Sequence, residues 1–262
     1  MIEHRHCNVL GVNISAISMD QAVSIADAHI RLGGRGYICV TGVHGVMEAQ
    51  SNPRLLRILN RSLLNAPDGM PTVWVGHLQG LRGMGRVYGP DFMLELCSLS
   101  VQRGFRHFLY GGKPGVAEKL GQVLTERFPG LLIVGTYTPP FRPLNESEKA
   151  DLKQRVADTR PDVIWVGLST PKQEQFMAEY IDSLETSLMV GVGAAFDIHT
   201  GRIADAPRWM KRCGLQWLHR LIQEPRRLWK RYLINNPRFL WNIGLQLLQL
   251  RTYEADPNSL SS

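Results

Sequence analysis

The residues most able to carry out chemistry stand where apolar runs give way to turns. Asp68 follows the short apolar run 63–67 and precedes Gly69. A lone carboxylate at a strand end can take a proton from an attacking hydroxyl, although an Asp before Gly is commonly a plain turn former. His44 comes three residues after Thr41, which ends another apolar run, and is either a site member or a satisfied polar residue. Spacing alone does not decide between these alternatives.

The stretch 162–176 joins a buried strand to a helix start. Thr170 suits an N-cap, Pro171 the first helical position, and Gln173 completes a capping box, so we expect a helix that begins at Pro171. A helix N-terminus beyond a strand's carboxyl end is where open α/β sheets bind anions. This predicts a phosphate-bearing substrate near Thr170, Lys172 and Gln173. An ordinary strand-to-helix connection is the alternative.

A glycine-rich turn, 111–115, invites a second phosphate hypothesis. Gly111 and Gly112 either let backbone amides approach a nucleotide or form a plain tight turn. The segment matches neither a Walker loop nor Gly-x-Gly-x-x-Gly, and no acid follows the next strand, which disfavours a dehydrogenase. Because the chain has no Asp-x-Asp pair, we expect neither a metal nor a cofactor, and cationic side chains and helix dipoles would stabilise a diphosphate instead.

The elements that must position these residues alternate at βαβ spacing. Residues 8–19 suggest a strand pair around Gly11, and the glycine-rich segment 80–86 a mobile surface loop. Further strands are predicted at 37–41, 105–110, 131–136, 162–167 and 188–193, with helices at 20–31, 53–63, 116–128 and 146–159. The fold class expected is therefore α/β, with a Rossmann-like, mostly parallel sheet flanked by helices.

The positive charge is concentrated in the last part of the chain. Between Arg202 and Arg251 there are eleven Arg or Lys against two acids, a net +9, so the remaining residues of a chain with net charge +7 sum to −2. Three basic amphipathic helices are expected there, one ending at Pro225 and the last beginning after Asn236-Pro237. We predict a core over residues 1–205 and a helical appendage over 206–262 that meets an anionic surface.

Composition limits the remaining classes. The four cysteines form no Cys-x-x-Cys pair, no run of about 18 apolar residues occurs, and the first residues lack the apolar core of a signal peptide, so a cytoplasmic protein is expected. A basic nucleic-acid-binding protein is the rival class, because Trp and Arg are interleaved in the tail. Aromatics at helical spacing suit a membrane interface or a core better than base stacking.

Motifs along nearly the whole chain carry a family resemblance. They are Asp68-Gly-Met-Pro71, Gly89-Pro-Asp91, Tyr110-Gly-Gly112, 166–174, 191–197, Gly201-Arg202, 206–210 and 223–227. In this order they resemble the WecG/TagA/CpsF glycosyltransferases, glycosyltransferase family 26, and most closely the exopolysaccharide (xanthan-type) glucosyltransferases. The resemblance implies transfer with inversion from a UDP-sugar to a polyprenyl-diphosphate-linked saccharide. Glucose is the favoured sugar, with N-acetylmannosamine or its uronic acid as alternatives.

Site residues follow from the same resemblance. It implies Asp68 as the catalytic base, Thr41 as a substrate-side polar residue, and His44 where many members have an Asn close after the Thr. The expected substrate-binding residues are Gly111, Gly112, Thr170, Lys172, Gln173, Asp197, Arg208, Arg212, Arg226 and Arg227. The implied partners are the donor, the lipid-linked acceptor and the anionic inner face of the cell membrane, with no nucleic acid; a homo-oligomer is allowed. The appendage would dock on the membrane and bring arginines to the leaving diphosphate.

Overall fold

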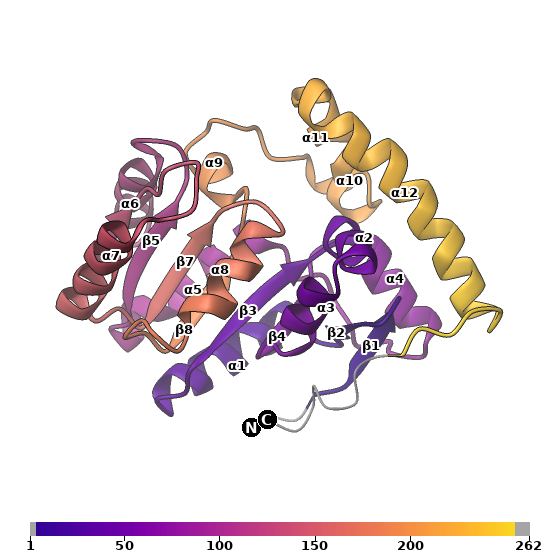
Figure 1. The fold of residues 1–262 in the computed structure, drawn as a ribbon, viewed down its shortest axis with the longest axis horizontal. Coiled ribbons are helices and arrows are strands. Elements are labelled where there is room, and N and C mark those ends of the chain that lie inside the picture. Colours follow the sequence, from indigo (N-terminus) through magenta and orange to yellow (C-terminus); the bar gives the residue numbers. More distant parts are fainter. Residues whose placement is uncertain (1–3, 255–262) are drawn as a thin grey trace. The chain divides into compact units, whose positions relative to one another are not determined.

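The computed structural model describes residues 4–254 and contains a six-stranded sheet flanked by helices (Figure 1). The strand order is β4-β3-β8-β7-β5-β6, and the pairs from β3 through β6 in this order are parallel. A separate antiparallel hairpin is formed by β1 (His6–Val9) and β2 (Val12–Ser15). The mostly parallel α/β fold and the hairpin around Gly11 are thus confirmed.

The chain divides into two compact units. The first comprises Asp20–Cys39 and Gly89–Ile203, and the second comprises 4–19, Val40–Tyr88 and 204–254. The first unit contains α1 (Met19–Arg31), α5 (Gly89–Arg103), β5 (Arg106–Gly111), α6 (Val116–Arg127), β6 (Leu132–Tyr137), α7 (Glu146–Thr159), β7 (Val163–Gly167), α8 (Lys172–Tyr180), β8 (Leu188–Gly191) and α9 (Ala195–His199). Strand β3 (Gly36–Thr41) begins in the first unit and ends in the second.

In the first unit, β7 lies between β5 and β8, and four of its five residues are buried. Its Val163–Val166 run is apolar because both faces of a parallel strand are covered. Trp165 is fully buried and its indole Nε1 donates to Nδ1 of His107 on β5 at 2.9 Å. Strands and helices therefore alternate along the first unit as the sequence pattern predicted.

The second unit contains α2 (Val43–Ser51), α3 (Pro53–Asn60), β4 (Leu64–Pro67), α4 (Met70–Leu78), α10 (Arg208–Arg212), α11 (Gln216–Gln223) and α12 (Pro225–Leu247). Helix α3 begins as predicted, because the Asn52 side chain accepts from the backbone N–H of Leu55 and Pro53 occupies the first turn. Residues 204–254 group with this unit; the predicted boundary between 205 and 206 stays a prediction.

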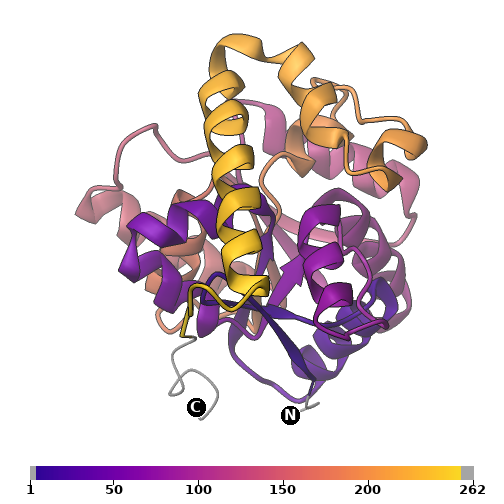
Figure 2. The ribbon, with the colours of Figure 1, turned by 90° about the vertical axis from the view of Figure 1, so that its right-hand side faces the viewer.

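The tail helices differ from the expected ones. The helix expected to end at Pro225 is broken into α10 and α11 at Gly214, whose φ is +69° and where a Cβ would come 2.7 Å from the Trp74 ring. The two helices expected on either side of Pro237 are one continuous helix, α12, drawn in yellow in Figure 2. Packing of the buried Leu228, Phe239 and Ile243 outweighs the helical hydrogen bond that a proline cannot make.

Helix α12 is fixed within the second unit along its length. It packs on α2, and near its end the Gln246 carboxamide accepts from Leu10 N–H and donates to Asn8 C=O, both at 2.8 Å. These bonds satisfy backbone groups of the β1–β2 hairpin that would otherwise be unpaired. The tail is therefore packed and hydrogen-bonded as an integral part of the second unit.

The glycine-rich segment 80–86 before α5 is a loop, as predicted, but it is partly buried rather than a surface loop, and its mobility stays a prediction. Leu81, Met84 and Val87 are buried, and the N–H of Val87 donates to Pro67 C=O at 2.8 Å. Apolar side chains spaced between the glycines anchor this segment in the core of the second unit.

Candidate active site

The second unit brings Thr41 and Asp68 together where β3 and β4 end. The backbone N–H of Asp68 donates to Thr41 C=O at 3.1 Å. Thr41 is buried, and its Oγ1 has no hydrogen-bond partner within the described residues. A Cβ added at Gly42 would lie 3.7 Å from Asp68 Oδ2, an ordinary van der Waals contact, so Gly42 lies directly beside the carboxylate. Thr41 and Asp68 are therefore neighbours, and the catalytic roles expected for them stay predictions.

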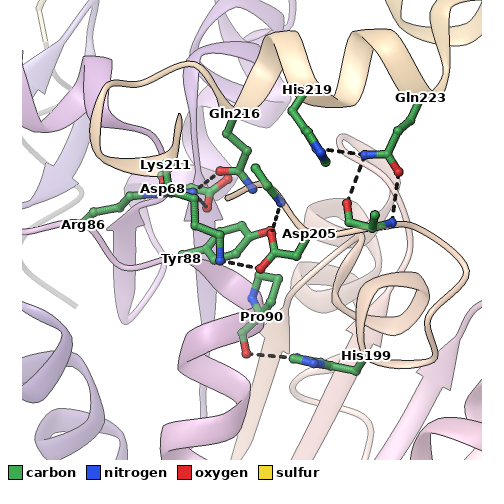
Figure 3. Close-up of polar contacts among 12 residues, drawn as sticks. Asp68, Arg86, Tyr88, Pro90, His199, Asp205, Lys211, Gln216, His219 and Gln223 are labelled. Atoms are coloured by element: carbon green, nitrogen blue, oxygen red, sulfur yellow. Dashed lines mark hydrogen bonds and ion pairs between the residues drawn. The ribbon is translucent and has the colours of Figure 1, made fainter. Parts of the chain in front are cut away.

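Arg86 contacts Asp68 from the segment that precedes α5 (Figure 3). Its Nε donates to the backbone carbonyl of Asp68, and its Nη2 donates to Oε1 of Gln216 on α11. The same Nη2 lies 4.0 Å from Asp68 Oδ1. A guanidinium in this position can also neutralise an incoming phosphate.

Tyr88 lies between two cations. Its ring centroid is 4.4 Å from the Arg86 guanidinium carbon and 4.6 Å from Lys211 Nζ. Its hydroxyl donates to Asp205 Oδ1 at 3.0 Å, and Lys211 forms an ion pair with the other carboxylate oxygen. Burial above all, and then the carboxylates of Asp205 and Asp68, raise the pKa of Tyr88. The hydroxyl therefore remains a hydrogen-bond donor at neutral pH.

One arginine of the tail, Arg231, adds positive charge near Asp68, and Arg220 lies close to Arg231. Burial lowers the pKa of Arg231, with smaller effects of Arg220 and Arg227 in the same direction, while Asp68 is close enough to oppose them. The Nε atoms of Arg220 and Arg231 are buried and have no hydrogen-bond partner between residues 4 and 254. Buried N–H donors of a cation need an acceptor, and an anion supplies one.

The tail arginines named from the sequence lie elsewhere on the second unit. Arg208, Arg212 and Arg226 are exposed, and Arg227 is exposed and paired with Glu224. Sequence reasoning therefore found the basic tail but missed Arg86 and Arg231, which the structure places near the carboxylate, and Arg220, which lies near Arg231. The only signal for Arg86 was a basic residue within a glycine-rich segment. Substrate binding by the four predicted arginines stays a prediction.

His44 lies in the first turn of α2. Its Nδ1 is 3.7 Å from Glu48 Oε1 and 3.4 Å from the Asn235 side-chain nitrogen on α12. These contacts connect α2 to the tail helix within the second unit. The catalytic role expected for His44 stays a prediction.

In the first unit, backbone conformation explains why positions 111 and 112 are both glycine. Gly111 has φ +126°, and a Cβ there would come 2.6 Å from the carbonyl oxygen of Gly167 on β7. Gly112 has φ +76° and donates its N–H to the same carbonyl at 3.1 Å. The tight-turn interpretation accounts for both residues, and a nucleotide contact stays a prediction.

The start of α8 differs from the expected capping box. The helix begins at Lys172, and the Thr170 hydroxyl donates to Glu174 Oε1 at 2.9 Å instead of capping. Gln173 is buried and donates from Nε2 to the same carboxylate oxygen at 3.0 Å, while its Oε1 has no partner in the described chain. The capping prediction is wrong because Glu174 lies buried beside Thr170 and takes its hydroxyl.

Two other predicted residues of the first unit lie on its surface. Lys172 is exposed, and Asp197 forms an ion pair with Arg202 at 3.0 Å. Their predicted part in substrate binding is untested by these contacts.

Neither a metal-binding cluster nor a membrane-spanning helix occurs among the residues that the structure describes. Between residues 4 and 254, no three His, Cys, Asp or Glu side chains gather in a way that could hold a metal ion. Within the same range, no helix has both the length and the apolar character needed to cross a bilayer.

Comparison with known proteins identifies the class. Residues 7–253 match the model of the glycosyl transferase WecG/TagA/CpsF family, and the chain belongs to this family. It is 31% identical over 176 residues to the N-acetylglucosaminyldiphosphoundecaprenol N-acetyl-beta-D-mannosaminyltransferase of Bacillus subtilis strain 168. The aligned region covers 67% of this chain and 66% of the relative. The protein of the same name from Bacillus spizizenii strain W23 is 32% identical over 187 residues, or 71% and 70% of the two chains.

These matches confirm the expected family, and with it the enzyme class over the nucleic-acid-binding alternative. The alignment with the first relative spans just under two thirds of that protein. A special closeness to xanthan-type glucosyltransferases stays unconfirmed, because both relatives are named as mannosaminyltransferases.

Proposed function

We propose that this protein is an inverting glycosyltransferase that moves a hexosyl unit from a UDP-sugar to a polyprenyl-diphosphate-linked saccharide. The names of the two relatives favour N-acetylmannosamine over glucose as the sugar, and N-acetylglucosaminyl-diphosphoundecaprenol as the acceptor. The uronic acid of N-acetylmannosamine and glucose are the alternative donor sugars to be tested. The product would serve exopolysaccharide or other cell-surface polysaccharide synthesis.

The observation that carries the proposal is the Asp68 carboxylate at the end of β4, which lies near the guanidinium groups of Arg86 and Arg231. In the proposed reaction Asp68 accepts the proton of the acceptor hydroxyl as its oxygen bonds to the sugar's anomeric carbon. The bond between that carbon and the nucleotide diphosphate breaks at the same time, on the opposite face. One carboxylate therefore suffices, and the configuration inverts.

Arg86, Arg220 and Arg231 are suited to stabilise the leaving diphosphate. Arg86 and Arg231 lie near Asp68, Arg220 lies near Arg231, and the buried Nε–H groups of Arg220 and Arg231 lack acceptors within the described residues. Donors held in place before the reaction act on charge as it develops, without reorganisation. This arrangement supports a reaction in which side chains, rather than a metal ion, balance the diphosphate.

Helix α12 suits contact with a membrane surface. Leu240 and Trp241 are 68% and 71% exposed, and Trp229 and Leu233 are also exposed. Amphipathic helices of this kind bury apolar side chains at the headgroup boundary, and each nearby Lys or Arg adds about 1 kcal/mol on an anionic leaflet. We therefore propose a cytoplasmic protein that is peripherally bound to the inner face of the cell membrane, where the lipid-linked acceptor resides.

Transfer from a panel of UDP-sugars tests the proposal. Full-length protein is incubated with UDP-N-acetylmannosamine, its uronic acid or UDP-glucose and a lipid-diphosphate N-acetylglucosamine acceptor, and products are identified by mass spectrometry. We expect a disaccharide lipid from UDP-N-acetylmannosamine with a β linkage. Failure of all three donors, with folded protein, would refute the proposed activity; transfer of glucose alone would overturn the proposed sugar.

A further inference from the structure

We propose that Tyr88 is a positioning residue that holds Arg86 beside Asp68 and fastens the start of the tail to the same place. The inference deepens the proposed function and rests on it for the role of Asp68. All the residues involved belong to the second unit, and Figure 3 marks the hydrogen bonds and ion pairs among them.

Arg86 is held at several points. Its Nε donates to Asp68 C=O, its Nη2 donates to Gln216 Oε1, and its guanidinium carbon lies 4.4 Å from the Tyr88 ring centroid. A free arginine side chain has many rotamers, and each contact removes some of them. The guanidinium is thus set in one orientation before any ligand arrives.

Tyr88 is itself anchored from the tail. Its hydroxyl donates to Asp205 Oδ1 at 3.0 Å, and the same oxygen accepts from the backbone N–H of Ala206 at 2.8 Å. Lys211 from α10 completes the arrangement, since its Nζ lies 4.6 Å from the ring centroid and pairs with Asp205. The ring is buried, where attraction between a cation and an aromatic face is strongest.

Two separate chemical groups of Tyr88 therefore have separate tasks. The ring face holds Arg86, and the hydroxyl holds Asp205 and through it residues 204–211. A guanidinium placed in advance contributes to the transition state, whereas one that must be ordered during the reaction contributes less. Loss of the ring should lower the turnover number more than it weakens donor binding.

The experiment compares Tyr88→Phe with Tyr88→Leu in the full chain. Phe keeps the ring face that holds Arg86 and loses only the hydroxyl, so its kcat should fall clearly less than that of Leu, which should lower kcat about tenfold or more with KM for the donor changed less than about threefold. Tyr180→Leu is the matched control, because Tyr180 is a buried tyrosine of the first unit. It should leave kcat near wild type.

A second measurement reports on Arg86 independently of sugar transfer. The Nε–H of Arg86 is hydrogen-bonded, so its ¹H–¹⁵N signal, assigned by its absence in Arg86→Lys, should be sharp in wild type and Tyr88→Phe. In Tyr88→Leu it should broaden or move to the position of solvent-exposed arginines. Should the Leu variant fail to fold, Tyr88→Met replaces it, since Met is a long apolar side chain without an aromatic face, and the same signal is expected to broaden.

The outcomes separate the two proposals. A wild-type Arg86 signal and wild-type kcat in Tyr88→Leu would overturn the positioning role, as would equal kcat losses in Tyr88→Leu and Tyr180→Leu. If wild-type protein transfers no sugar, the proposed function fails, while the Arg86 signal still decides whether Tyr88 positions the guanidinium.

Discussion

Replacing His107 with Phe should make the first unit less sensitive to acid. His107 is fully buried on β5, its Nδ1 accepts from Trp165 Nε1, and its Nε2 has no partner among residues 4–254. Burial lowers the pKa of His107 from 6.5 to about 3. The folded state therefore keeps the ring neutral at pH values where the unfolded chain binds a proton.

The sign and size of the effect follow from proton linkage. Because the unfolded state binds the proton more readily, the free energy of unfolding falls as pH drops below 6.5, by about 1.4 kcal/mol per pH unit. Between pH 7.5 and 4.5 His107 alone should cost roughly 2.5 kcal/mol. Phe does not bind a proton, so it makes no pH-dependent contribution to the free energy of unfolding. It leaves the Trp165 N–H without an acceptor, however, which costs about 1–3 kcal/mol at every pH.

Urea unfolding at pH 7.5 and 4.5, followed by far-ultraviolet circular dichroism, measures this difference. We expect His107→Phe to be less stable than wild type at pH 7.5 and to approach or exceed it at pH 4.5. Other groups that titrate cancel because they are common to both proteins. A stability gap between the two proteins that is the same at both pH values would refute the assignment of a neutral buried imidazole.

Other predictions concern the site and the tail. Asp68→Asn should bind UDP normally but turn over about 10² times more slowly or worse, as measured by initial rates with saturating substrates. Activity should survive EDTA; loss that Mg²⁺ or Mn²⁺ restores would show that a metal balances the diphosphate. Changing Leu240 and Trp241 together to Ser should reduce flotation with anionic vesicles without lowering the unfolding midpoint, whereas Leu32→Ser, 83% exposed in the first unit, should change neither. Gly111→Ala should destabilise the protein by about 2 kcal/mol or more in urea unfolding, because its Cβ meets rigid backbone of β7.

Much of the fold was predictable because its signals are local. The capping asparagine before Pro53 and the apolar run 163–167 each act within a few residues, and both elements lie where predicted. The helices of the tail were harder to predict, because Gly214 and Pro237 are both residue types that commonly end a helix. Gly214 breaks the chain against Trp74, while Pro237 is carried inside a helix whose packing outweighs its missing N–H, and only tertiary contacts distinguish the two.

The candidate site was predictable only where a strand end marked it. Thr41 and Asp68 end neighbouring strands, and topology brings them together. Arg86 and Arg231 stand in segments without a strand-end signal, so their approach to Asp68 depends on how the polypeptide folds back. Exposed arginines such as Arg226 looked equivalent in the sequence, since charge patterning cannot tell a buried cation from a solvated one.

The bonds between Gln246 and the β1–β2 hairpin also constrain the order in which the protein can fold. Leu10 and Gln246 are 236 residues apart, so the bond that joins them closes one of the longest loops in the chain. The first unit consists mostly of one continuous segment, 89–203, whereas the second needs three separate segments. During synthesis, the hairpin and α2 must wait for α12 to leave the ribosome. The surface of α2 that α12 will cover stays exposed for that interval, and the unit that carries Asp68 is completed last.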